Sequence, residues 1–337
     1  MKRYGHLFER IVTFDNLLKA AKKALRGKRD RAAVAQFYFS LEPELLLLEQ
    51  ELLTGAYVPR PYRSFMVYEP KPRRICAADI RDRVVHHAIC SVLDPVFEAF
   101  SVYDSYACRK DKGTHRAIRR AQSFARKTGY FLKLDVEKFF DSVDHQCLKH
   151  LLKRKFKDGK LLGLLERIID HPIPDGVPGK GLPIGNLTSQ HFANFYLGYL
   201  DHYAKDEMGI GFYIRYMDDV LVFADDKESL HMHLASIRHF LGERLLLTLK
   251  DRSTMVAPVT QGIPFLGLQV FRGTLRLQRG ARTRFRRKLK RRERDYVEGR
   301  IDERALLQSV HSLVGHVRQA DTYGLRKSFL DSTAIMG

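Results

Sequence analysis

Two adjacent acids interrupt an apolar run in Phe212-Tyr213-Ile214-Arg215-Tyr216-Met217-Asp218-Asp219-Val220-Leu221-Val222-Phe223. Residues 212–216 and 220–223 have the length and the aromatic and β-branched content of short strands. Burying two unpaired carboxylates inside a sheet would be costly, so we expect Asp218 and Asp219 at the turn of a β-hairpin. Aspartate is common in turns for purely structural reasons, so the hairpin alone leaves a structural and a functional role equally open.

A third acid ends another apolar segment. Residues 130–135, Tyr-Phe-Leu-Lys-Leu-Asp, are predicted to form a strand that ends at Asp135. Helices are predicted to about residue 156, over 188–206 and over 227–243, with short strands near 246–249 and 264–271. This order matches the split β-α-β pattern of a ferredoxin-like sheet, in which Asp135 lies beside the hairpin. The alternative is that Asp135 is the N-cap of the helix that follows.

Three converging carboxylates predict a metal site. Hard oxygen ligands suit Mg²⁺, which keeps coordination positions for substrate phosphates. Two such ions about 4 Å apart can activate a 3′-hydroxyl and stabilise leaving pyrophosphate. Phosphoryl transfer needs little else from a protein beyond positioning and charge neutralisation. We therefore predict that Asp135, Asp218 and Asp219 are catalytic and bind two Mg²⁺ ions, with Mn²⁺ as the alternative ion.

The charge balance favours a polyanionic partner. The 337 residues include 59 Lys and Arg against 39 Asp and Glu, a net charge of +20. Such a positive field raises the local concentration of nucleic acid, although solubility alone is the alternative. The basic residues are densest over 276–294. We expect a template–primer duplex or a structured RNA to bind there; the alternative is that these residues form a solvated basic face. The predicted nucleic-acid-binding residues are Arg284, Arg286, Arg287, Lys288, Lys290 and Arg291.

Several other classes of protein are disfavoured. The four cysteines form no CxxC pair, so a structural zinc site is not expected. We expect them to be buried thiols in a reducing cytoplasm. Neither an apolar run near 20 residues nor a charged-then-apolar leader occurs, so we expect no membrane span and no signal peptide. The sequence therefore predicts a cytoplasmic protein.

The motifs taken together resemble those of reverse transcriptases. Residues 134–141, with Leu134-Asp135 and Phe139-Phe140-Asp141, and residues 216–219 look like the two acidic motifs of that family. Further stretches match in order: residues 68–75, 82–87, 106–109, 112–115 and 265–267. The resemblance implies an α+β right-hand polymerase with fingers, a ferredoxin-like palm and a helical thumb. It divides the chain into a basic helical extension (1–56), fingers and palm (57–273) and a basic thumb (274–337).

The resemblance also implies which residues contact the nucleotide. Phe140 takes the place of the steric gate that excludes a ribose 2′-hydroxyl, with core packing as the alternative. Strand periodicity puts Lys71 and Arg73 on one face and Arg74 on the other, which leaves open which of them reaches the triphosphate and whether the face is merely solvated. The implied nucleotide-binding residues are Lys71, Arg73, Arg74, Phe140, Ile184, Gly185 and Gln190.

The subfamily is indicated by Gly181-Leu182-Pro183-Ile184-Gly185-Asn186-Leu187-Thr188-Ser189-Gln190. Most reverse transcriptases have Pro-Gln-Gly here and end in Ser-Pro, whereas this form is similar to the enzymes of diversity-generating retroelements. Ile184 replaces a glutamine that packs against the incoming nucleotide in relatives, and isoleucine forms no side-chain hydrogen bond. A site that loses polar contacts discriminates less between correct and wrong nucleotides, and in this family the errors fall at template adenines, so we expect error-prone copying there. The alternative is that Ile184 only packs in a loop.

The resemblance implies a set of partners: a template-repeat RNA, the RNA/DNA duplex, dNTPs, and an accessory variability protein that is a small basic oligomer. One alternative stays within the fold, a defence-associated, retron-like or group II-like reverse transcriptase. Another is an RNA-binding scaffold without catalysis, against which the intact acids argue.

Overall fold

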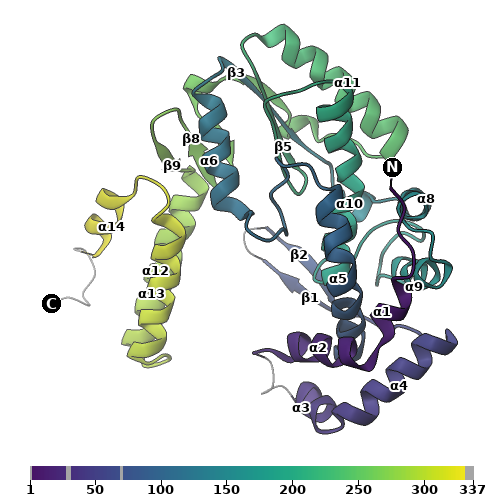
Figure 1. Ribbon diagram of the computed structural model, residues 1–337. Coiled ribbons are helices and arrows are strands. Elements are labelled where there is room, and N and C mark those ends of the chain that lie inside the picture. The colour runs from purple at the N-terminus through teal and green to yellow at the C-terminus, as the bar shows by residue number, and fades with distance from the viewer. Residues whose placement is uncertain (1, 28–31, 69–70, 331–337) are drawn as a thin grey trace.

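Four helices form the N-terminal part of the protein. The computed structural model describes residues 2–27, 32–68 and 71–330 (Figure 1). The four helices pack around one another and against the long helix α5 (Ile80–Phe100). They are α1 (Phe8–Val12), α2 (Phe14–Leu25), α3 (Ala32–Phe39) and α4 (Leu41–Thr54). Leu45, Leu48 and Leu52 of α4 are buried at helical spacing, and Gly55, at φ 76°, ends the helix in the left-handed conformation. The predicted helical character of this part is confirmed.

The palm sheet has four antiparallel strands in the order β4-β5-β3-β6. They are β3 (Tyr130–Asp135), β4 (Tyr213–Tyr216), β5 (Asp219–Ala224) and β6 (Met255–Pro258). One face of the sheet, which includes Leu132 and Val222, packs in the main core with α8 (His145–Lys155), α10 (Leu187–His202) and α11 (Lys227–Leu245). The other face, with Phe131 and Phe223, packs on α6 (Gly113–Ala125). This arrangement confirms the α+β class and the ferredoxin-like palm.

Three details of the palm differ from the prediction. The chain after β3 is not one helix: it forms α7 (Phe139–Ser142), breaks, and restarts as α8 at His145. Helix α9 (Gly159–Ile169), capped by the Asp158 side chain, was not predicted. The predicted strand at 246–249 is wrong, because Leu246, at φ 52°, ends α11 and only Leu249 forms an isolated bridge, to Val136. The edge strand is β6 instead.

Two smaller sheets and three helices complete the fold. Strands β1 (Arg63–Val67) and β2 (Arg73–Ala77) pair antiparallel, as the extended pattern of the predicted fingers requires. A three-stranded sheet follows the palm, with β7 (Ile263–Phe265), β8 (Leu268–Val270) and β9 (Leu275–Leu277). The basic segment forms α12 (Arg279–Val297), which packs on α13 (Glu303–Val317), and α14 (Tyr323–Leu330) comes last.

The three helices of the C-terminal part stand apart from the N-terminal helices, with α6 and the palm strands between the two sides (Figure 1). Phe285 and Leu289 of α12 meet Val317 of α13 in a small core of their own. Within the described ranges, no helix is long and apolar enough to span a bilayer.

Candidate active site

The predicted acids come together at one end of the palm sheet. Asp135, the last residue of β3, lies directly opposite Asp219, the first residue of β5. Residues opposite each other in an antiparallel pair project from the same face of the sheet. Asp218 precedes Asp219 in the turn, so the three acids are neighbours in space. The N-cap alternative for Asp135 is excluded, because the next helix begins only at Phe139.

The acids form an electrostatically unfavourable group in the absence of a cation. Oδ1 of Asp219 is buried and has no hydrogen-bond partner, although Nζ of Lys133 lies 3.3 Å from it. Burial raises the pKa of Asp219 to about 7; Lys133 opposes this shift, and the charges of Asp135 and Asp218 add to it. Burial also raises the pKa of Asp218, and the charge of Asp135 contributes in the same direction. These groups fit a divalent cation, whose charge would stabilise the ionised carboxylates.

The side-chain arrangement does not by itself define a metal site. In the part of the chain that the structure describes, no group of three or more His, Cys, Asp or Glu side chains has the arrangement of a metal site. The assignment of Asp135, Asp218 and Asp219 as metal ligands therefore stays a prediction, supported by their register and by the unpartnered oxygen of Asp219.

The hairpin that carries two of the acids has a strained turn. Tyr216 pairs with Asp219, which leaves Met217 and Asp218 as a two-residue loop. Of these two described residues, only Met217 has a positive φ, 56°, as in a type II′ turn. The left-handed conformation costs a side-chain-bearing residue roughly 1–2 kcal/mol. Contacts from outside the loop must therefore hold it.

A buried arginine supplies those contacts, and the sequence analysis missed it. Nη1 of Arg215 donates to the carbonyl oxygen of Met217 at 3.0 Å. Nε and Nη2 of Arg215 each lie 2.6 Å from the carboxylate of Asp201, and both side chains are almost fully buried. The hydroxyl of Tyr213 also donates to Asp201, at 2.7 Å. The signal that could have revealed this network is a lone arginine in an otherwise apolar strand.

Residues 181–190, the segment that indicates the subfamily, contact β2, the second strand of the fingers. The amide of Cys76 donates to the carbonyl oxygen of Ile184 at 2.9 Å, and the Asn186 side chain bonds the backbone of Cys76 and Ala78. Gly185 has φ 116°, and a Cβ there would lie 2.7 Å from Cγ2 of Ile75. Ile184, Gly185 and β2 therefore form one junction, in which Ile184 is partly exposed.

One of the three basic residues predicted to act in the fingers, Arg74, forms a close ion pair. Nη1 of Arg74 lies 2.6 Å from the carboxylate of Asp175 and donates to the carbonyl of Pro174. Arg73 and Lys71 are exposed, and the charge of Arg73 lowers the pKa of Asp218. Arg74 thus anchors a loop, while which of these residues reaches the triphosphate stays a prediction.

The remaining predicted nucleotide contacts lie near this junction. Phe140 is partly buried against the main core, with its ring 5.7 Å from that of Phe139. Its carbonyl oxygen accepts a hydrogen bond from the amide of Leu182 at 2.7 Å, which places it between β3 and the Ile184 segment. Gln190, in the first turn of α10, is partly exposed, and its Oε1 accepts from Sγ of Cys108 at 3.5 Å.

Helix α12 carries the basic residues that the sequence predicts to bind nucleic acid. Only Phe285 and Leu289 of this helix are buried, so the cationic side chains surround a narrow apolar seam. Arg286, Lys290 and Arg291 are exposed together with Arg287, whereas Arg284 and Lys288 are half-buried. A groove of about 330 Å³ between α12 and α13 is lined by Lys288, Arg291, Arg292 and polar residues of α13.

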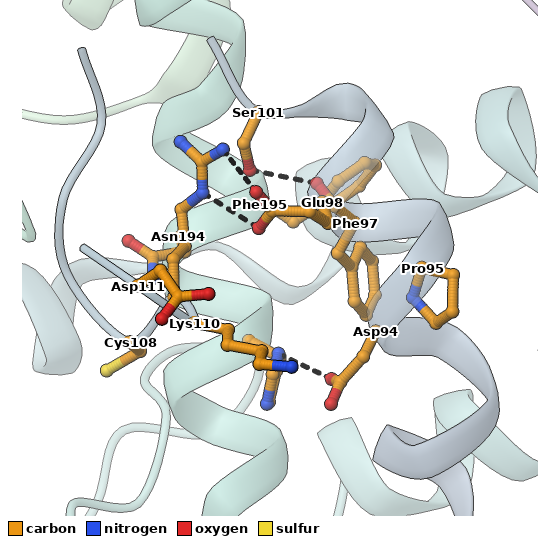
Figure 2. A pocket seen from close by; sticks show the side chains of 12 residues that line it. Asp94, Pro95, Phe97, Glu98, Ser101, Cys108, Lys110, Asp111, Asn194 and Phe195 are labelled. Carbon is orange, nitrogen blue, oxygen red and sulfur yellow. Dashed lines mark hydrogen bonds and ion pairs between the residues drawn. The ribbon is translucent and has the colours of Figure 1, made fainter. Parts of the chain in front are cut away.

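A pocket of about 420 Å³ lies between α5 and α10 and contains none of the three acids. Figure 2 shows two acids that line it, Asp94 and Glu98. Arg109 contacts the carboxylate of Glu98 at 2.6 and 2.9 Å. Nδ1 of His191 lies 3.4 Å from Asp94. The first pair joins the segment around Arg109 to α5, and the second joins α10 to α5.

Comparison with known proteins gives consistent results. A family model described as reverse transcriptase (RNA-dependent DNA polymerase) matches residues 68–270. Protein YkfC of Escherichia coli is 26% identical over 277 residues, which cover 69% of this chain and 72% of that protein. The group II intron-encoded protein LtrA of Lactococcus lactis is 24% identical over 199 residues, 57% of this chain and 33% of LtrA. This chain therefore matches about a third of LtrA.

Among solved structures, telomerase from Candida albicans in complex with a fragment of telomeric RNA is similar, with a TM-score of 0.47 and 12% sequence identity. The alignment covers 82% of this chain and 56% of the telomerase chain.

Proposed function

The chain belongs to the reverse transcriptase family, and on that premise we propose that its RNA-directed DNA polymerase activity resides in Asp135, Asp218 and Asp219. The observation that carries the proposal is the register of the palm sheet, in which Asp135 stands opposite Asp219 beside the Asp218 turn. Primer extension on an RNA template, with wild type and Asp218→Asn, tests it.

The residues around the acids have separate tasks in this proposal. When bound, two divalent cations, Mg²⁺ or alternatively Mn²⁺, supply charge neutralisation for the attacking and leaving oxygens. Lys133, held by the carbonyl of Pro264 at 2.8 Å, keeps Asp219 oriented at the end of β5. Arg73 of the fingers is exposed, its charge lowers the pKa of Asp218, and it would contact the triphosphate of the dNTP. The basic surface of α12 would hold the RNA/DNA duplex by phosphate contacts.

Arg73→Ala is expected to raise the KM for dNTP about tenfold, because a charge-assisted contact to phosphate contributes about 1.5–3 kcal/mol. Arg74→Ala is the matched control, since Arg74 is the adjacent residue and already pairs with Asp175. Single-nucleotide insertion kinetics measure both variants. Equal effects, or a larger effect of Arg74→Ala, would contradict the assignment.

Phe140→Ala is expected to admit ribonucleotides, improving rNTP use relative to dNTP use by on the order of 10²-fold. The side chain is partly buried against the main core and its backbone carbonyl bonds the amide of Leu182; in the proposed gate role, removal of the ring would open room for a 2′-hydroxyl. Competition between dATP and ATP in primer extension measures the ratio. Phe140→Tyr keeps the bulk and should stay selective; unchanged selectivity of Phe140→Ala would assign the ring to core packing.

A second proposal concerns the kind of reverse transcriptase. We propose that the chain copies a template-repeat RNA of a diversity-generating retroelement into adenine-mutagenic cDNA, with an accessory variability protein as its partner. The Pro-Ile-Gly and Ser-Gln sequence of residues 183–190 supports this, together with the position of Ile184 at the junction with β2. The test is to copy the adjacent noncoding RNA and sequence the cDNA; errors spread evenly over all template bases would reject the subtype.

The similarity to LtrA supports a second candidate, a group II-like reverse transcriptase that copies without an adenine bias. The same cDNA sequences separate the two candidates.

Ile184→Gln is expected to lower misincorporation opposite template adenine about tenfold, because a polar side chain restores a contact that favours the correct nucleotide. Sequencing of cDNA made by wild type and variant measures the error rate at each template base. Ile184→Leu retains an apolar side chain of the same size and should keep the wild-type error rate. An unchanged rate in Ile184→Gln would make Ile184 a packing residue only.

A further inference from the structure

Arg215 occupies an unusual position for a charged residue. Among the side chains of residues 2–27, 32–68 and 71–330, it is the bulkiest that is fully buried, with 1% exposure, and its partner Asp201 has 0%. Apolar side chains of similar volume often stabilise a core as well as a buried ion pair does. The ion pair alone therefore gives no reason for an arginine at this position.

The guanidinium connects three separate segments. Its Nε and one Nη2 proton go to Asp201 on α10, and the second Nη2 proton lies between Oγ of Ser105 (3.2 Å) and the carbonyl of Asn194 (3.3 Å). Its Nη1 donates to Oδ1 of Asn194 at 3.1 Å and to the carbonyl of Met217 at 3.0 Å. All five donors of the planar fork are used. One side chain thus joins α10, the segment before α6 and the turn of the acidic hairpin.

The contact to Met217 is the one that bears on catalysis. Met217 has φ 56°, and its carbonyl is the backbone group immediately before Asp218. Without a donor at that carbonyl, the two-residue loop can relax to another turn and carry Asp218 away from Asp135. Lysine could pair with Asp201, but its single ammonium cannot reproduce the fork that also reaches Asn194 and Met217.

Helix α10 adds a second connection. It begins at Leu187, directly after the Ile184–Gly185 junction, and Asn194 lies seven residues further on, about 10 Å along the helix. The guanidinium therefore ties the acidic turn to the same rigid helix that follows the predicted nucleotide-binding segment.

We propose that Arg215 is a positioning residue of the polymerase, which fixes the Met217–Asp218 turn on α10 and so sets the place of Asp218 relative to Asp135 and Asp219. The proposal rests on the proposed catalytic role of Asp218. It is tested with Arg215→Lys, which keeps a positive charge beside Asp201, and with Arg120→Lys as the matched control. Arg120 also makes a two-point contact to an aspartate, Asp104. The carbonyl of Asp104 accepts from the amide of Arg215 at 3.0 Å, but the hydrogen bonds of the Arg120 side chain go to the Asp104 carboxylate.

The measurements separate a positioning role from a structural one. Arg215→Lys is expected to lower the single-turnover rate about 100-fold, as misplacement by 1 Å can do, with dNTP KM and template–primer affinity within threefold of wild type. Hydrogen exchange should accelerate in the peptide 212–224 and in the segments around Ser105 and Asn194 that the guanidinium reaches, and stay unchanged in the rest of the protein. Arg120→Lys should keep the wild-type rate. A rate of Arg215→Lys within threefold of wild type, or faster exchange throughout the protein, would overturn the proposal.

A second variant decides the matter if Arg215→Lys does not fold. Asn194→Ala leaves the ion pair with Asp201 intact and removes one anchor of the fork. A rate loss of about tenfold supports the proposal, and a wild-type rate overturns it. Failure of the proposed function is distinguishable, because it is reported by Asp218→Asn extending primers as fast as wild type, whatever Arg215 does.

Discussion

Asp218→Asn is expected to lower the rate of RNA-templated primer extension by about 10³-fold, because the loss of one carboxylate removes several kcal/mol of charge stabilisation from phosphoryl transfer. The substitution keeps the size and shape of the side chain, so the turn that Arg215 holds through Met217 should survive. Single-turnover extension with Mg²⁺, and again with Mn²⁺, measures the effect. Template–primer affinity should stay near the wild-type value.

A matched control for this variant is Asp225→Asn, at an exposed acid just after the other end of β5. It should retain the wild-type rate. If Asp218→Asn extended primers at the same rate as the control, the assignment of the acids as the catalytic group would be wrong.

Asp201→Ala is expected to destabilise the protein by about 3–5 kcal/mol, because it leaves the guanidinium of Arg215 buried without a counter-charge. The hydroxyl of Tyr213 would lose its acceptor as well. Urea unfolding followed by circular dichroism measures the change. Asp206→Ala is the control: Asp206 is an exposed acid that pairs with His202, and its loss should stay within about 0.5 kcal/mol.

A double substitution separates the contribution of charge to stability from the contribution of side-chain volume in the Asp201–Arg215 pair. Asp201→Leu combined with Arg215→Met removes both charges and retains apolar volume, so most of the lost stability should return. If Asp201→Ala alone cost less than about 1 kcal/mol, solvent would have to reach Arg215, in disagreement with its burial.

The palm strands could be predicted from the sequence because their signals are local. Residues 130–135 form the predicted strand, and the acids lie at a hairpin as predicted, although the loop is Met217–Asp218 and Asp219 already begins β5. The helix break after β3 was missed because it lies at Val143, which is extended at φ −60° and ψ 119°, and at Asp144, whose side chain accepts from the amide of Cys147 and so starts a new helix. Strand β6 was missed because its place at the edge of the sheet is set by pairing with β3, over 120 residues away.

The candidate site, like the fold, was only partly predictable from the sequence. Sequence periodicity left open which of Arg73 and Arg74 reaches the triphosphate, and only the folded chain shows that the charge of Arg73 lowers the pKa of Asp218 and that Arg74 pairs with Asp175. The support beneath the hairpin was not predictable, since Arg215 and Asp201 meet across two elements and neither belongs to a recognisable short motif. The roles of the three acids stay predictions for the experiments above.

The junction between Ile184, Gly185 and Ile75 limits which of two adjacent positions can vary. Gly185 has no room for even one added carbon atom beside Ile75, and its backbone angle disfavours every other amino acid. Ile184, its immediate neighbour, is partly open. Under the proposed role of Ile184 in fidelity, substitutions that adjust copying accuracy would therefore arise at Ile184 and not at Gly185.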